Sequence, residues 1–428
     1  MKIVVVALGK IGLPLAVQFA GSGHEVVGVD VNPAVVDLVN AGTEPFPGEA
    51  ELAERLADVV SRGALRATTD YGEAVPGADA VVLVVPLFVD GDGVPDFGWM
   101  DAATRSLAEH LTPGTLVSYE TTLPVGTTRT RWKPMLEEGS GLTEGTDFHL
   151  VFSPERVLTG RVFADLRTYP KLVGALSPEG ARRATEFYQA VLQFDDRTDL
   201  PRPNGVWDLG SAEAAEMAKL AETTYRDVNI GLANQFARFA GAHGIDVQQV
   251  IEACNSQPYS HIHQPGIAVG GHCIPVYPRL YLWNDPDATV VRAAREANAG
   301  MPEHAVTLLA DAYGDLTGAR VLVLGASYRG GVKETAFSGV FPTVAALRSR
   351  GAQVTVSDPM YSSDELAALD LPPHTDGDPV DAVVVQADHA SYRDLSAEDL
   401  PGVKVVVDGR RVTDPARFPG VVHRVIGA

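Results

Sequence analysis

The sequence predicts an α/β fold in which two doubly wound domains are joined by a central all-helical region. Short runs of β-branched residues alternate with longer helical patterns at both ends of the chain, as in parallel sheets covered by helices. The stretch between them, from Ser211 to Gly241, reads as one long alanine-rich helix. With 428 residues the chain exceeds what one hydrophobic core usually serves, so two or three domains are expected.

The start of the chain has the pattern of a dinucleotide-binding strand, turn and helix. A strand from Lys2 to Leu8 leads into Gly9 and Gly12, and a second strand, Val26 to Val29, ends at Asp30. Amides at such a helix start hold a pyrophosphate, and the acid accepts hydrogen bonds from ribose hydroxyls. Because Asp30 would repel a 2′-phosphate, NAD is favoured over NADP.

One position departs from the usual glycine pattern, since Ala7 stands where its first glycine is expected. The alternative is therefore a glycine turn that only packs a helix against a strand. The context, at the first strand and with an acid about twenty residues on, favours a cofactor site in a Rossmann-like domain. The residues predicted to bind the cofactor here are Gly9, Lys10, Ile11, Gly12 and Asp30.

The same sheet is expected to continue through strands at Ala80 to Val85, Leu116 to Tyr119 and Phe148 to Phe152, with a helix from Met100 to Leu111. Thr122 lies in a loop that leaves the second of these strands. Its hydroxyl could bond the cofactor or the substrate, although threonines near a helix start are often caps.

A carboxylate and a guanidinium follow the third of these strands, at Glu155 and Arg156. They could be a general base and a phosphate or sugar contact, and the alternative is an exposed ion pair. On the long helix, Lys219 and Thr223 are one turn apart and share a face, so both could contact one ligand. A helical lysine of this kind more often lies in solvent.

A glycine-rich stretch after a second helix, Val247 to Ala253, carries one of the two cysteines. Gly270 and Gly271 let the backbone turn tightly before Cys273, and such a thiol suits a nucleophile. The alternative is a small buried side chain without reactivity.

The C-terminal part reads as a second Rossmann-like half. A strand and turn at Gly318 to Gly325 are followed by a helix, Phe341 to Arg350, and by strands at Gln353 to Ser357, Ala382 to Gln386 and Lys404 to Asp408. The predicted domains are 1–199, 206–300 and 315–428.

Composition narrows the class further. The net charge of −21 argues against a general nucleic-acid binder, and apolar residues make up an ordinary 45%. No apolar run approaches a membrane span, so we expect no membrane partner and a cytoplasmic location. Two cysteines are too few for a disulfide framework, and no zinc-site spacing is present, so no metal is predicted.

With these motifs in order, the chain resembles the UDP-glucose/GDP-mannose dehydrogenase family over essentially its whole length. In having a histidine, His272, directly before the cysteine, the chain is similar to the branch of the family that oxidises UDP-N-acetylhexosamines. The motifs that carry the resemblance are Leu8 to Leu15, Thr122 to Thr128, Ser153 to Arg156, Lys219 to Glu222, and Gly270 to Pro275.

The resemblance implies an NAD-dependent 6-dehydrogenase that oxidises a sugar C6 alcohol to the uronic acid in two steps. Cys273 would form a thiohemiacetal and then a thioester, Lys219 would stabilise the oxyanion, and Glu155 would act through a water as general base. Thr122 would serve both catalysis and the cofactor. Arg329 or Lys333 could stand in for an arginine that is usual in the family, as a contact to the cofactor or the nucleotide. The remaining implied substrate contacts are Arg156, Thr223, Tyr259, Gly270 and Gly271.

The resemblance also implies a C-terminal domain that holds the nucleotide and a homodimer formed through the central helix. The chain departs from the family at Tyr277, Thr223, Tyr259 and Ala336, where aspartate, asparagine, arginine and arginine are usual. Two alternatives stay open at this point. One is a UDP-glucose or GDP-mannose 6-dehydrogenase, and the other is a nucleotide-sugar-binding protein without turnover.

Overall fold

The computed structural model describes residues 1–91 and 93–428. By its contacts the chain divides into two compact units, Met1–Ala221 and Glu222–Ala428. The long helix α9 (Ala212–Ala242) begins in the first unit and continues into the second. Part of the expected central helical region therefore packs within each unit.

Unit 1 is built on an eight-stranded sheet of order β10-β9-β8-β7-β4-β1-β2-β3. A short antiparallel hairpin, β5 (Phe88–Val89) with β6 (Pro95–Asp96), stands apart from it. The strands of the sheet are β1 (Lys2–Val6), β2 (Glu25–Val29), β3 (Leu65–Thr68), β4 (Ala80–Leu83), β7 (Leu116–Tyr119), β8 (His149–Phe152), β9 (Lys171–Ala175) and β10 (Val206–Asp208).

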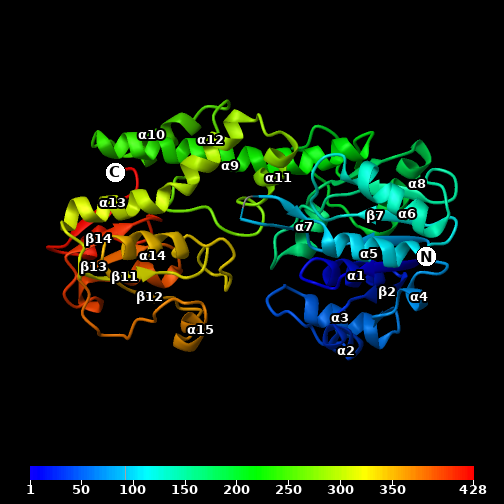
Figure 1. The fold of residues 1–428 in the computed structure, drawn as a ribbon, viewed down its shortest axis with the longest axis horizontal. Helices are drawn as coiled ribbons and strands as arrows, with labels where there is room; N and C mark the ends of the chain where they lie inside the picture. Colours follow the sequence, from blue (N-terminus) through cyan, green and yellow to red (C-terminus); the bar gives the residue numbers. More distant parts are fainter. Residues whose placement is uncertain (92) are drawn as a thin grey trace. The chain divides into compact units, whose positions relative to one another are not determined.

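Helices cover both faces of this sheet, as Figure 1 shows. Alternate strand residues point to opposite faces, so Ile3 and Val5 enter one core while Val4 and Val6 enter the other. The helices of unit 1 are α1 (Gly12–Gly21), α2 (Pro33–Asn40), α3 (Leu52–Ser61), α4 (Tyr71–Ala74), α5 (Gly98–Ala108), the π-helical turn η1 (Thr128–Trp132), α6 (Lys133–Ser140), α7 (Val162–Thr168) and α8 (Pro178–Val191).

The last two strands on one side of this sheet, β9 and β10, run parallel to each other and opposite to the rest. β8 pairs with β7 in parallel, but it pairs with β9 antiparallel, with Val151 opposite Ala175 and Phe152 opposite Gly174. The first residue of β9 therefore lies at the edge of the sheet where β7 and β8 end.

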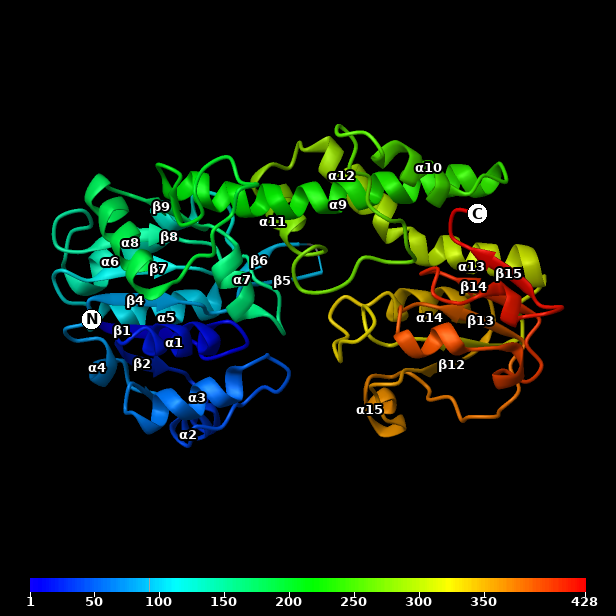
Figure 2. The same cartoon turned by 180° about the vertical axis from the view of Figure 1, so that it is seen from behind.

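Unit 2 carries a five-stranded parallel sheet of order β12-β11-β13-β14-β15 (Figure 2). Its strands are β11 (Arg320–Leu324), β12 (Gln353–Ser357), β13 (Ala382–Val385), β14 (Val405–Asp408) and β15 (Val422–Val425). Helices α13 and α14 pack on one face through residues such as Leu309 and Leu347. The helices that follow α9 are α10 (Val247–Asn255), α11 (Tyr277–Asn284), α12 (Thr289–Ala299), α13 (Met301–Tyr313), α14 (Val340–Ser349) and α15 (Ser363–Ala368), with 3-10 turns η2 (Ala390–Asp394), η3 (Ala397–Asp399) and η4 (Pro415–Arg417).

The predicted fold class is confirmed, because both ends of the chain form parallel-sheet, Rossmann-like folds and a helical stretch separates them in sequence. The strands predicted at Leu116–Tyr119 and Gln353–Ser357 match residue for residue. Among the described residues, none of the helices combines the length and the apolar character that a bilayer span requires. The bounds of the three predicted domains stay a prediction.

Candidate functional site

The turn between β1 and α1 has the close packing of a dinucleotide-binding turn. A Cβ atom on Gly12 would lie 1.9 Å from the carbonyl oxygen of Ala7, so only glycine fits there. The Asp30 carboxylate accepts a hydrogen bond from the Leu8 amide at 2.8 Å and ties the turn to the end of β2. Ala7 adopts φ of 72°, a left-handed conformation that favours the glycine usual at this position.

The same turn fits the NAD that the sequence predicts. A Cβ on Gly9 would meet no atom within 4 Å, so the backbone surface at Gly9 is open to a ligand. Ile11, at the N-cap of α1, has no side-chain group that could occupy the first amides of the helix. Lys10 is exposed beside them, and Asp30 keeps lone pairs for ribose hydroxyls. These residues would bind the pyrophosphate and one ribose.

The loop that carries Thr122 is held by a carboxylate from α9. Glu216 accepts hydrogen bonds from the amides of Gly126, at 2.5 Å, and Thr128, at 2.9 Å, and from the Thr128 hydroxyl at 2.6 Å. Burial raises the pKa of Glu216 to about 7. Thr122 itself is buried, and Lys219 follows Glu216 by three residues on the same helix. The structure thus connects the predicted loop with the helix of the predicted lysine.

Glu155 is not half of an exposed ion pair. The Nζ atom of Lys171 donates hydrogen bonds to Glu155 Oε2 at 2.8 Å and to Glu120 Oε2 at 2.7 Å. Burial acts to raise the pKa of Glu155, but the charge and hydrogen bond of Lys171 outweigh it and leave that pKa below its usual value. The Arg156 amide donates to Glu155 Oε1 at 2.8 Å, whereas the Arg156 guanidinium donates to the carbonyl of Pro170.

The two predicted residues of α9 are both inside the protein. Lys219 is 8% exposed and Thr223 is 6% exposed. The alternative that Lys219 lies in solvent, as helical lysines more often do, is therefore wrong. The charge of Lys219 also acts to lower the pKa of Glu155. Lys219 and Glu155 are therefore electrostatically coupled within unit 1.

In unit 2 the cysteine is exposed rather than packed as a small hydrophobic residue. Its sulfur lies 3.8 Å from the hydroxyl of Tyr277, the first residue of α11. The amide of Tyr277 donates to the Cys273 carbonyl at 2.9 Å, which fixes the cysteine at the start of that helix. An exposed thiol beside a hydroxyl can act as a nucleophile.

The glycines before the cysteine make room for the 327–337 loop of the C-terminal sheet. A Cβ on Gly270 would lie 2.5 Å from Cβ of Tyr328, and Gly271 adopts φ of 93° while its amide donates to the Ala336 carbonyl at 2.8 Å. His272 Nε2 lies 3.3 Å from Glu334 Oε2. The cysteine loop is thus bound to a loop of the C-terminal domain, which the family resemblance expects to hold the nucleotide.

Two further predicted contacts lie at the surface of unit 2. Arg329 is exposed, and its Nε donates to the Tyr328 hydroxyl at 3.3 Å. The Tyr259 side chain is 92% exposed. Their assignment to cofactor and substrate stays a prediction.

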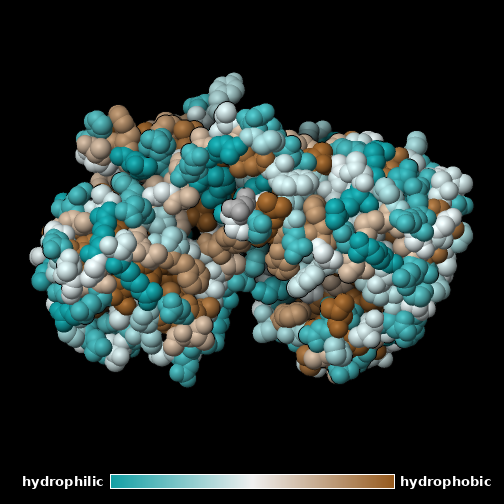
Figure 3. All heavy atoms as spheres, viewed as in Figure 1, coloured by the Kyte–Doolittle hydropathy of each residue, from teal (hydrophilic) through white to brown (hydrophobic). Residues whose placement is uncertain are grey.

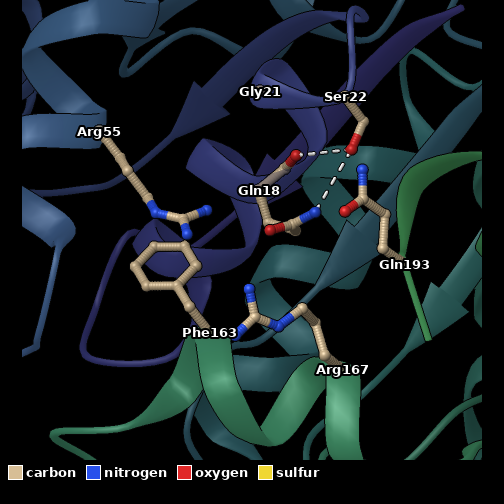
Figure 4. Close-up of a pocket in the computed structure, with 7 residues that line it drawn as sticks. All are labelled: Gln18, Gly21, Ser22, Arg55, Phe163, Arg167 and Gln193. Atoms are coloured by element: carbon tan, nitrogen blue, oxygen red, sulfur yellow. Dashed lines mark hydrogen bonds between the residues drawn. The ribbon is translucent and has the colours of Figure 1, made fainter. Parts of the chain in front are cut away.

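A separate cavity of about 140 Å³ in unit 1 involves none of the predicted residues (Figure 4). The Arg55 guanidinium lies 4.4 Å from the ring centre of Phe163 and also pairs with Glu51. Arg167 lies 4.0 Å from Asp195. The cations of this cavity thus already face carboxylates, and we assign it no function. Its lining consists of Gln18, Gly21, Ser22, Arg55, Phe163, Arg167 and Gln193.

Sequence reasoning missed three buried polar residues around Glu155 and Thr122, namely Glu120, Lys171 and Glu216. A signal for Lys171 was present, because a lysine opens the otherwise apolar stretch Lys171–Ala175. A buried lysine needs a carboxylate partner, but the partner could not be named without the direction of β9.

Comparison with known proteins agrees with this geometry. The chain matches the UDP-glucose/GDP-mannose dehydrogenase family in its NAD binding domain over residues 1–192, its central domain over 213–300 and its UDP binding domain over 322–415. A UDP-N-acetyl-D-mannosamine dehydrogenase of Pyrococcus horikoshii is 36% identical over 437 residues, which cover 100% of this chain and 99% of that protein.

Solved structures give the same result. The structure of UDP-D-ManNAc dehydrogenase from Pyrococcus horikoshii matches with a TM-score of 0.88 and 34% identity, covering 100% of this chain and 99% of that one. A UDP-glucose dehydrogenase from Pyrobaculum islandicum matches with a TM-score of 0.86 and 27% identity, covering 99% and 97%. The NAD cofactor and the family predicted from the motifs are both confirmed. This chain belongs to the UDP-glucose/GDP-mannose dehydrogenase family and is an NAD-dependent dehydrogenase.

Proposed function

We propose that this enzyme oxidises the C6 alcohol of a UDP-N-acetylhexosamine to the uronic acid. The observation that carries the proposal is the exposed thiol of Cys273, preceded by His272, on a loop bound to the nucleotide-binding half. The end-to-end similarity to a UDP-N-acetyl-D-mannosamine dehydrogenase supports an acetylated sugar. UDP-N-acetylmannosamine and UDP-N-acetylglucosamine are the first candidates.

In the proposed reaction Cys273 retains the sugar between two oxidations. NAD, held at the β1–α1 turn by Gly9, Gly12 and Asp30, would supply the hydride acceptor for C6 in each oxidation. The thiolate attacks the aldehyde carbon, which forms a C–S bond and a thiohemiacetal, and the second oxidation leaves a thioester on the sulfur. Tyr277, whose hydroxyl lies 3.8 Å from that sulfur, would donate a hydrogen bond to the thiolate.

Lys219 and Glu155 would serve the oxyanion and the hydrolysis. The buried ammonium of Lys219 would stabilise negative charge on the C6 oxygen, with Thr122 and Thr223 as hydrogen-bonding neighbours of the substrate. Glu155, kept ionised by Lys171, would take a proton from the water that attacks the thioester. A C–O bond forms, the C–S bond breaks, and the Cys273 thiolate leaves.

The UDP-binding half would hold the nucleotide. The match to a UDP binding domain supports this part of the substrate. Arg156 and Arg329 would supply cations for its phosphates, and Gly270 and Gly271 would let the sugar lie against the backbone. Because Cys254 and Cys273 are both free thiols, we place the enzyme in a reducing, cytoplasmic compartment.

A homodimer through α9 is part of the proposal. Exposed apolar side chains recur on one face of this helix, and Figure 3 shows apolar atoms among polar ones where α9 and α10 lie. Substituting Phe239→Glu in this row should shift the molecular mass in light scattering from dimer to monomer. A monomeric wild type would contradict the proposed interface. The row consists of Tyr225, Leu232, Phe236 and Phe239.

The substrate is tested by steady-state NADH formation with UDP-N-acetylmannosamine, UDP-N-acetylglucosamine, UDP-glucose and GDP-mannose. We expect kcat/KM for one acetylated sugar to exceed the values for UDP-glucose and GDP-mannose by at least about a hundredfold. A site that hydrogen-bonds the acetamido group leaves polar groups unpaired when a sugar without that group binds. A higher value for UDP-glucose or GDP-mannose would replace the proposed substrate with that sugar. If a sugar nucleotide raises the Tm but no NADH forms, the protein binds nucleotide sugars without turnover.

A further inference from the structure

The antiparallel strand β9 brings a lysine and two carboxylates to one edge of the sheet in unit 1. In the register of β8 with β9, residue 151 faces residue 175 and residue 152 faces residue 174. Continued beyond β8, the same register places Glu155 opposite Lys171. Glu120 directly follows β7, the next strand of the sheet, and its carbonyl accepts a hydrogen bond from the Glu155 amide at 3.3 Å.

All three side chains are enclosed. The side chain of Lys171 is 3% exposed, that of Glu120 is 0% exposed and that of Glu155 is 11% exposed. Lys171 Nζ donates to both carboxylates and lies 4.8 Å from the ring centre of Tyr188. A buried ammonium held between two carboxylates fixes the position of each, because breaking either pair would leave an uncompensated buried charge.

The two carboxylates have different surroundings. Glu120 accepts a hydrogen bond from the Tyr188 hydroxyl at 2.5 Å and is fully enclosed, and burial raises its pKa to about 7. Glu155 is reached by the Arg156 amide and by the charges of Lys171 and Lys219, and its pKa lies below the usual value. Enclosure thus disfavours a negative charge on Glu120, whereas the two lysines favour the ionised form of Glu155.

We propose that Lys171 is the positioning residue of Glu155, and that its second ion pair, with Glu120, holds the ammonium in place so that Glu155 remains an ionised base. This inference rests on the proposed function, in which Glu155 activates the water that hydrolyses the thioester on Cys273. Lys171 makes no contact with substrate in this role. It holds Glu155 Oε2, while the Arg156 amide donates to Oε1.

The test separates thioester formation from thioester hydrolysis. In a Lys171→Met variant, rapid mixing should give a first NADH burst within about threefold of wild type, while steady-state kcat falls at least tenfold. Intact-mass measurement should show a uronyl adduct on Cys273 that builds up during turnover. The acid limb of the kcat–pH profile should move up by about one to three pH units, the usual effect of an adjacent opposite charge.

Further variants distinguish positioning from a structural role. Lys171→Met leaves the carboxylates of Glu120 and Glu155 without the cation between them, so they repel each other. The double variant Lys171→Met with Glu120→Gln removes this repulsion and should recover part of the lost kcat. Lys171→Arg should keep the acid limb near its wild-type pH. Lys133→Met removes a partly exposed lysine that pairs with Glu137 at 3.9 Å and should change none of these values.

Three results would overturn the proposal. They are an equal loss of burst and steady-state rates, an unmoved acid limb, or further loss of kcat on adding Glu120→Gln to Lys171→Met. Failure of the proposed function looks different, because the wild type itself would then form neither a burst of NADH nor an adduct on Cys273.

Discussion

The two glycines of the β1–α1 turn should respond differently to the same substitution. A Cβ on Gly12 would lie 1.9 Å from the Ala7 carbonyl oxygen, where a carbon–oxygen contact needs roughly 3.3 Å. The atom in the way is backbone, which cannot rotate aside. We therefore expect Gly12→Ala to cost about 3 kcal/mol, the upper part of the range for overpacking.

Gly9→Ala provides the matched control. Its Cβ would meet no protein atom within 4 Å, so the fold should tolerate it. The added methyl group would occupy the surface against which the NAD pyrophosphate lies. A steric loss of about 1–3 kcal/mol corresponds to a roughly 5- to 150-fold weaker Kd for NAD.

Two assays separate the effects. Thermal unfolding followed by circular dichroism should show a Tm lower by roughly 6–12 °C for Gly12→Ala, and a change below about 2 °C for Gly9→Ala. Titration calorimetry should show the weaker NAD binding in Gly9→Ala. Wild-type NAD affinity in Gly9→Ala, or an unchanged Tm in Gly12→Ala, would refute the roles given to these residues.

Three other predictions concern single side chains. Ala7→Gly should raise stability by up to about 1 kcal/mol, because relief of a left-handed alanine exceeds the added chain entropy; a lower urea midpoint would contradict this. The pKa of Glu216 rises from 4.5 to about 7 on burial, so the folded state keeps its proton where the unfolded state has lost it. Stability should thus fall as pH rises from about 4.5 to 7, and Glu216→Gln should flatten this slope in Tm measured against pH. Tyr277→Phe removes the hydroxyl 3.8 Å from Cys273 and should lower kcat about three- to tenfold without lowering Tm; an unchanged kcat would exclude the hydroxyl from catalysis.

Local pattern was enough to predict the cofactor turn. Gly12 and Asp30 are close in sequence, and their spacing follows from one strand, one turn and one helix. The structure adds that Ala7 takes the conformation of the missing glycine. The cysteine loop could also be predicted, because Gly270 and Gly271 allow a tight turn of the backbone directly before Cys273.

The surroundings of Glu155 could not be predicted in this way. Lys171 reaches Glu120 and Glu155 only because β9 runs antiparallel to β8, and the direction of one strand in a mostly parallel sheet leaves little trace in its own residues. The burial of Lys219 could not be predicted for a related reason. A helix pattern shows which residues share a face, but not whether a buried carboxylate faces them.

The central claim is that Cys273 carries the substrate through two oxidations. The most direct test counts NADH per sugar consumed in single turnover, with uronate measured in the same sample, for wild type and Cys273→Ala. We predict two NADH and one uronate per sugar in the wild type. The variant should give at most one NADH per sugar and no uronate. Two NADH and a full yield of uronate from Cys273→Ala would contradict the account.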